Sequence, residues 1–331
     1  MTARGRPAGS SACEHTAVDS GSQMRRRLVP MLLLVVSAAV ACNPAPAGPT
    51  GPDAPDQVTP DDAIKATGAR SAADAFVQAY ASDTTSSVGA LQALAGTALL
   101  KSWVHWLSVQ NREFPGAITG NVSNDQIGPA APFAVTTVPG SDAILRQVDV
   151  RATVTFTLRP DTGQPFSAIR SLDGPMRLIL DPSGGWKVLD FTRDGIPLSR
   201  EFEIVQGGTA SDRGVHMTMA AFFSAPYWEF GLVVSSDATL GVVRKSTTLL
   251  DANGKLVASA QAVTSSIERI PAGSAVEGIV TFAPQASATG LTLRVVLKGK
   301  AGSSVVEFPL GNLIHPVALT NPTSPAPSPA G

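Results

Sequence analysis

The chain has 331 residues, of which 44% are hydrophobic and 15% are charged, and its formal net charge at pH 7 is −1. This composition supplies enough apolar surface for a folded core and excludes a chain that is disordered throughout. The balanced charge argues against a nucleic-acid partner held through its phosphates, so we expect no nucleic acid among the partners.

An uncharged apolar run lies close to the N-terminus. Three arginines at residues 25–27 precede the run, which covers residues 28–41, and Cys42 follows it. The run of about 14 residues has the length of the apolar region of a signal peptide and falls short of the roughly 18 to 20 residues that span a bilayer. The signal is complete from Met24, so we expect translation to begin there. The alternative is that residues 1–23 are a long N-terminal region of the signal. We interpret residues 1–41 as a polar extension plus a signal peptide.

The order of arginines, apolar run, small residues and cysteine resembles the lipobox of bacterial lipoproteins. The resemblance implies that the thiol of Cys42 carries a lipid anchor of diacylglycerol and palmitate, and that the mature chain begins there. The sequence departs from the family pattern at Ala39, where Leu or Val is usual. The alternative is an ordinary secretory signal cut after Ala41, with Cys42 incidental. From the resemblance we expect an extracytoplasmic protein that its lipid holds on the cell membrane.

Two Pro-rich segments flank the part of the chain that is patterned for folding. Residues 42–58 are rich in proline and glycine and predict an extended tether. Residues 315–331 have the same character and predict a disordered tail. Between them we expect two domains, at residues 59–198 and 199–314.

The first domain begins with helical patterns and ends with strands. Thr59 and Pro60 form a helix start, and a later apolar stripe predicts one helix over residues 88–110. The segment QVDVRATVTFTLRP, residues 147–160, alternates apolar and polar positions and predicts a half-buried strand. Two further strands flank the turn residues 181–185. This order predicts an α+β domain, with helices packed on one face of a curved antiparallel sheet.

The ending DPSGGWKVLDF, residues 181–191, resembles the closing hairpin of nuclear-transport-factor-2-like domains, in which a glycine turn leads into a strand reading Trp-x-Val. The resemblance implies a cone-like fold, whose interior is a pocket in some members. It also implies a place for a His/Asp dyad in that pocket, and the candidates here are His105 and Asp190. The alternative, which we favour, is that His105 is a packed or half-exposed helix residue and Asp190 an edge carboxylate.

The sequence of the second domain predicts an all-β fold. Short alternating segments recur along it, and TTLLDANGKLVAS predicts a hairpin that turns at Asn253 and Gly254. Six to eight strands at about this spacing predict a β-sandwich. The domain resembles an immunoglobulin-like domain of unknown function found on bacterial surface lipoproteins. The resemblance depends on Asp251, Gly254, IPAG at 270–273, EGIVTFAP at 277–284 and LTLRV at 291–295.

Aromatic residues gather at two places. The segment FFSAPYWEF, residues 222–230, either builds the sandwich core and the contact between domains or exposes aromatic rings to a partner, and we favour the core. Trp103, Trp106 and Trp186 are expected to fill the space between helix and sheet. No paired histidines, phosphate-binding loop, nucleophile elbow or dinucleotide fingerprint is present in the sequence, so we expect no metal and no cofactor.

Two functions are compatible with the sequence. The first is a non-catalytic lipoprotein of the cell envelope that binds or scaffolds protein partners, and this is the function that we expect. The alternative is a small-ligand carrier or an enzyme that uses a pocket in the cone-like domain. Polar groups that converge on a cavity would favour the alternative, whereas an interior filled with apolar side chains would favour the first.

Overall fold

The structure, a computed structural model, describes residues 59–82, 88–114, 116–133, 143–300 and 302–316. The expected signal peptide, Cys42 and the tether therefore lie outside the described residues, as does the chain beyond residue 316. The described part is rich in β-strands and has a few helices, as the sequence predicts in outline. Within it, no helix is both long enough and apolar enough to cross a lipid bilayer.

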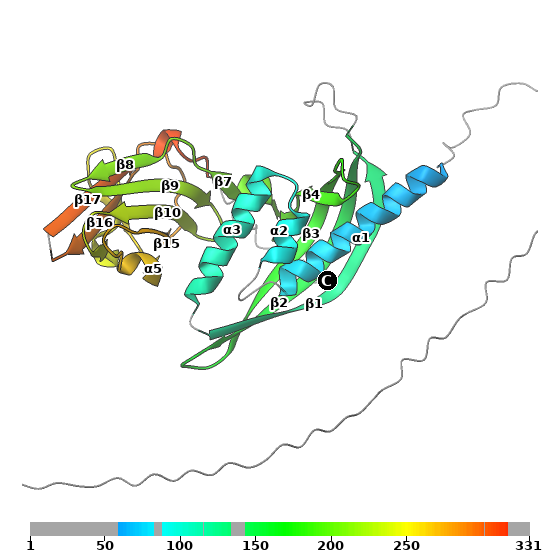
Figure 1. Cartoon of the computed structure of the whole chain (residues 1–331), viewed down its shortest axis with the longest axis horizontal. Coiled ribbons are helices and arrows are strands. Elements are labelled where there is room, and N and C mark those ends of the chain that lie inside the picture. Colours follow the sequence, from blue (N-terminus) through cyan, green and yellow to red (C-terminus); the bar gives the residue numbers. More distant parts are fainter. Residues whose placement is uncertain (1–58, 83–87, 115, 134–142, 301, 317–331) are drawn as a thin grey trace, which may run out of the picture. The chain divides into compact units, whose positions relative to one another are not determined.

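Three helices cover one face of a four-stranded antiparallel sheet (Figure 1). The strands lie in sequence order, and each pairs with the next. The strand predicted over residues 147–160 is confirmed, and its apolar positions from Val148 to Val154 are buried against the helices. The elements are α1 (Pro60–Ser82), α2 (Gly89–Leu94), α3 (Ala98–Glu113), β1 (Gly116–Pro132), β2 (Leu145–Pro160), β3 (Phe166–Leu180) and β4 (Trp186–Asp190).

The single helix predicted over residues 88–110 is wrong, because the structure has two helices there, α2 and α3. Between them the N–H of Gly96 donates to the carbonyl of Val188 in β4 at 2.7 Å. Thr97 then caps α3, since its hydroxyl oxygen accepts the N–H of Leu100 at 3.1 Å. The break depends on a strand far along the chain, which the local apolar stripe does not reveal.

Both predicted glycine turns are confirmed, and they share one design. A carboxylate oxygen of Asp181 accepts the N–H groups of Ser183 and Gly185, each at 2.9 Å. Asp251 accepts the N–H groups of the residues two and four positions later, at 2.8 and 2.9 Å. The glycine of each turn has a positive φ, 87° at Gly184 and 76° at Gly254, which the missing side chain permits.

Two antiparallel sheets form the second part of the described chain. The first contains β7 (Phe202–Ile204), β8 (Thr209–Asp212), β9 (Val215–Phe223), β10 (Trp228–Ser236), β14 (Ala262–Val263) and β15 (Ala275–Phe282). The second contains β11 (Leu240–Val242), β12 (Thr248–Leu250), β13 (Leu256–Ser259), β16 (Thr292–Gly299) and β17 (Gly302–Pro309). Their facing side chains form one apolar core, to which Met217 and Met219 contribute from one sheet and Leu293 and Val295 from the other.

Short elements connect the two parts and close the chain. β5 (Thr192–Arg193) and β6 (Ile196–Pro197) form a small ribbon that leads into α4 (Leu198–Glu201). The remaining helical turns are α5 (Ser265–Glu268), η1 (Arg244–Ser246) and η2 (Leu310–Asn312). His315, which the sequence assigns to the tail, donates its backbone N–H to the carboxylate of Glu203 at 3.0 Å.

The aromatic segment 222–230 is mostly core, as favoured from the sequence. Phe222, Trp228 and Phe230 lie inside the core of the second part, with ring centroids 5.3 to 6.3 Å apart. Phe223 turns the other way and belongs to the core of the first part. Tyr227 is the exception, since 48% of its surface is exposed.

The outer face of the β9-β10-β15 sheet packs against α3. Trp106 of α3 lies so close to Gly231 of β10 that a Cβ atom there would be 2.9 Å from the indole ring. Ala221, Phe223 and Ile279 project from the same sheet face and are buried in the core of the first part. This face is therefore apolar because another part of the chain covers it.

Candidate functional site

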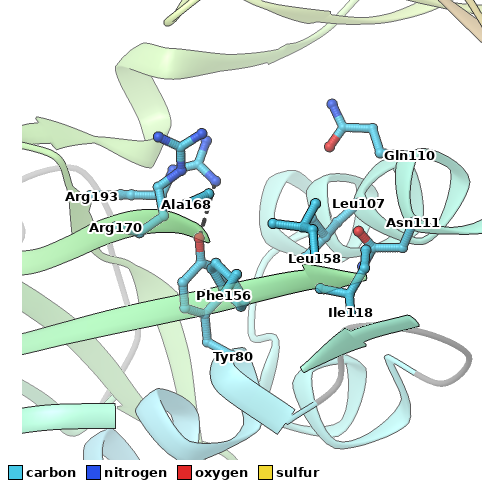
Figure 2. A pocket seen from close by; sticks show the side chains of 10 residues that line it. All are labelled: Tyr80, Leu107, Gln110, Asn111, Ile118, Phe156, Leu158, Ala168, Arg170 and Arg193. Atoms are coloured by element: carbon cyan, nitrogen blue, oxygen red, sulfur yellow. Dashed lines mark hydrogen bonds between the residues drawn. The ribbon is translucent and has the colours of Figure 1, made fainter. Parts of the chain in front are cut away.

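A cavity of about 160 Å³ lies between α3 and the strands β1, β2 and β3. Figure 2 shows Arg170 and Arg193 at one side of it, near Tyr80, and residues of α3 at the other. The wall combines aliphatic, aromatic and polar side chains. The lining residues are Tyr80, Leu107, Gln110, Asn111, Ile118, Phe156, Leu158, Ala168, Arg170 and Arg193.

The buried guanidinium of Arg193 organises the polar side of the cavity. Its two nitrogens Nε and Nη2 bond both carboxylate oxygens of Glu201, the first at 3.2 Å. Nη1 donates to the hydroxyl of Tyr80 at 3.4 Å, and the guanidinium lies 5.6 Å from the centre of the Trp103 ring. Burial alone would lower the pKa of Arg193, but the neighbouring Tyr80 and Glu201 oxygens raise it, so the group stays charged.

Glu229 of β10 stands next to this pair and is bonded by Gln110, whose side-chain amide donates to its carboxylate. Burial raises the pKa of Glu229 to about 7, and the charge of Glu201 adds to the rise. Arg193, the bond from Gln110 and Arg170 act in the opposite direction and are outweighed. Glu229 therefore changes its charge near neutral pH, which is rare for a glutamate.

The size of the cavity limits what it can hold. Its volume of about 160 Å³ is below the roughly 300 to 1,000 Å³ of sites for drug-sized ligands. The space beneath it is filled by aromatic rings, since Trp103 and Phe191 are buried with their ring centroids 5.3 Å apart. The wall offers apolar surface at Leu158 and a guanidinium at Arg170.

The structure does not bring the candidate dyad together. The Nε2 atom of His105 lies 3.0 Å from a carboxylate oxygen of Glu277 in β15, and the His105 side chain is 47% exposed. The carboxylate of Asp190 accepts the N–H and the hydroxyl of Ser199, at 3.2 and 2.7 Å, at the start of α4. No hydrogen bond joins His105 to Asp190 among the described residues, and neither lines the cavity.

The three tryptophans have three different neighbours. Trp103 fills the space between helix and sheet, where it contacts Tyr80 and Phe191. Trp106 instead packs on Gly231 of the second part. Trp186 lies against α1, where a Cβ atom at Gly68 would come within 2.7 Å of the indole nitrogen.

The sequence analysis missed the charged residues around the cavity. Arg193 and Glu201 are eight positions apart, which matches neither helix nor strand periodicity, and the β5-β6 ribbon lies between them. Glu229 left a signal in the sequence, because it is the one charge in an otherwise uncharged segment, FFSAPYWEF. No group of three or more residues that could hold a metal ion occurs in the part of the chain that the structure describes.

No protein-family model matches the chain, and neither the curated proteins nor the solved structures include a detectable match.

Proposed function

We propose that the chain is a non-catalytic lipoprotein of the cell envelope, anchored to the membrane through Cys42, with a binding or scaffold role for protein partners. In this proposal residues 59–198 are a nuclear-transport-factor-2-like domain and residues 199–314 an immunoglobulin-like sandwich. The tether of residues 42–58 holds both off the lipid surface.

The observation that carries the non-catalytic role is the set of contacts that His105 and Asp190 make. Asp190 accepts the N–H and the hydroxyl of Ser199 in α4, and His105 bonds Glu277. Each residue thus has a structural partner, and the two are not arranged to pass a proton between them. The aromatic filling around Trp103 also supports the proposal, because it leaves only a small space.

The lipid anchor is tested by mass spectrometry of the chain purified from membranes. We expect a mature N-terminus at Cys42 that carries diacylglycerol, and release of a Cys42→Ser variant from the membrane. An unmodified Cys42, or a Cys42→Ser chain that stays firmly membrane-bound, would contradict the proposal. Deleting residues 1–23 should leave export intact.

The binding role is tested by cross-linking the anchored chain in intact cells. A partner should be recovered equally with the wild-type chain and with His105→Ala, because His105 performs no chemistry in this proposal. Asp190→Asn, which keeps one acceptor oxygen for Ser199, is the matched variant for the second residue. If either folded variant loses a measurable chemical activity of the wild-type chain, the non-catalytic role is wrong.

The cavity favours a second candidate function, that of a carrier for a small amphipathic molecule. Its polar side with Arg170 and its apolar side with Leu158 suit a short carboxylate. Benzoate and hexanoate are suitable probes in a titration followed by NMR. Saturable binding that Leu158→Trp abolishes, with the fold intact, would support the carrier function. No binding of either probe at millimolar concentration would exclude this function.

A further inference from the structure

A series of contacts joins α3 to the outer face of β10 and β15, and we call it the α3 joint. It contains Trp106 on Gly231 and Gln110 on Glu229, together with Ile279, which lies beside Gly231. Ile279 is 2% exposed and belongs to the core of the first part. The joint is therefore closed to solvent at its centre.

Charged and polar groups at the C-terminal end of α3 form the rim of the joint. Glu277 lies 3.0 Å from His105 and 3.5 Å from Arg112. The carboxylate of Glu113 accepts the N–H and the hydroxyl of Ser265, at 2.7 and 2.6 Å. Burial opposes these bonds, but they outweigh it and lower the pKa of Glu113, which stays ionised.

Glu229 differs from the rim groups because its carboxylate has few donors. Gln110 supplies one bond, whereas Arg193, the guanidinium that acts on Glu229 most strongly, is already paired with both oxygens of Glu201. The other charged group that acts on Glu229 is Arg170, which lies 3.4 Å from Asp194. An ionised Glu229 therefore adds a second negative charge beside Glu201 in a site whose positive charges are engaged.

We propose that the α3 joint is a proton-controlled latch, which is closed while Glu229 is protonated and opens when Glu229 ionises. The Glu229 side chain is only partly exposed in the closed joint, and movement of α3 away from β10 would hydrate its ionised carboxylate fully. The apolar contact between Trp106 and Gly231 opposes this movement. The joint then responds to pH.

His105 contributes to the rim through its contact with Glu277 at 3.0 Å. A variant at His105 is therefore the matched control that alters the rim and leaves Glu229 in place.

A buried cysteine reports directly on the opening of the joint. The chain has two natural cysteines, so a full-length chain with Cys13→Ser and Cys42→Ser carries no thiol. In this background Ile279→Cys places a thiol at the centre of the joint. Val280→Cys is the matched control, because the next residue of the same strand faces the core of the second part. Labelling rates are divided by the rate of a small free thiol at the same pH.

Between pH 6 and pH 8 we expect the corrected labelling rate of Ile279→Cys to rise about ten-fold, the ratio that follows from a pKa of about 7 in the closed joint and an ordinary value in the open one. Adding Glu229→Gln should remove most of this rise, since glutamine keeps the oxygen acceptor for Gln110 and does not titrate. Adding His105→Gln, which alters only the rim, should leave the rise in place. Val280→Cys should show no rise.

Three results would overturn the proposal. The first is a flat rate for Ile279→Cys, and the second is a rise that Glu229→Gln leaves unchanged. The third is an equal rise for Val280→Cys, which would indicate opening of the whole second part. Hydrogen exchange of α3 in the natural chain and in Glu229→Gln tests the same equilibrium without a cysteine, and should show faster exchange at pH 8 only in the natural chain after correction for intrinsic rates.

Discussion

The two cores of this chain differ in the polar groups that are buried at their edges. The core of the first part ends at a buried Arg193–Glu201 pair with Glu229 beside it, whereas the buried polar groups around the second core are hydroxyls, those of Ser236, Thr247 and Ser304. A core edged by hydroxyls is stable over a wide pH range because nothing in it titrates. The first core gains a pH response and a cavity from its charges, at a cost in stability. We therefore expect function in the first core and at its contact with the second.

The largest effect should come from removing Arg193. Arg193→Met leaves the carboxylate of Glu201, which is 3% exposed, without its partner, and a broken buried ion pair costs about 3 to 5 kcal/mol. Urea unfolding measures the loss. The double variant Arg193→Met with Glu201→Leu should recover most of it, because an apolar pair replaces the ion pair. A double variant as unstable as the single one would show that the guanidinium matters for Trp103 and Tyr80 instead.

The next effect concerns the contact between the two cores. Gly231→Ala adds a methyl group 2.9 Å from the indole of Trp106, and such overpacking costs about 2 to 3 kcal/mol. The combination with Trp106→Leu should cost less than the sum of the single changes, because the smaller side chain makes room. Additive losses in the double-mutant cycle would mean that Trp106 and Gly231 do not contact one another.

A smaller effect follows from the charge of Glu229. Its pKa is raised from 4.5 to about 7, so its contribution to stability is complete below pH 4.5 and is lost as the pH rises through 7. The free energy of unfolding of the natural chain should therefore fall by about 2 kcal/mol between pH 5 and pH 8 through this group. Glu229→Gln should remove that fall. An equal fall in both proteins would assign the pH dependence to other groups.

Local patterns predicted those parts of the fold that depend on neighbours in sequence. The alternation from Val148 to Val154 gave the strand β2, and the Asp-to-Gly turns at Asp181 and Asp251 gave two hairpins. The same alternation places Glu229 on the outer face of β10, between Trp228 and Phe230. Whether that face meets water or α3 is decided by residues more than a hundred positions earlier, so the sequence did not reveal the joint.

The sequence likewise indicates only part of the candidate site, because contacts between distant residues form the rest. The sequence offers His105 and Asp190 as candidates beside a structural alternative, and the structure places His105 against Glu277 and Asp190 against Ser199. The sequence does not mark Arg193 and Arg170 as cavity residues, because a lone arginine in a strand usually faces solvent. Only the pairing of β5 with β6 turns Arg193 inward toward Glu201.

The smallest predicted effect tests whether the first part can unfold locally while the second part stays folded. Thr97 caps α3 through the N–H of Leu100, and loss of such a cap costs about 1 kcal/mol. We expect Thr97→Ala to raise hydrogen exchange in the first turn of α3 and to leave the strands β16 and β17 unchanged, since they contribute only to the second core. Thr97→Ser keeps the hydroxyl and should exchange like the natural chain. If Thr97→Ala also accelerates exchange in β16, then the two cores unfold as one cooperative unit, and the difference between them is one of chemistry and not of independent stability.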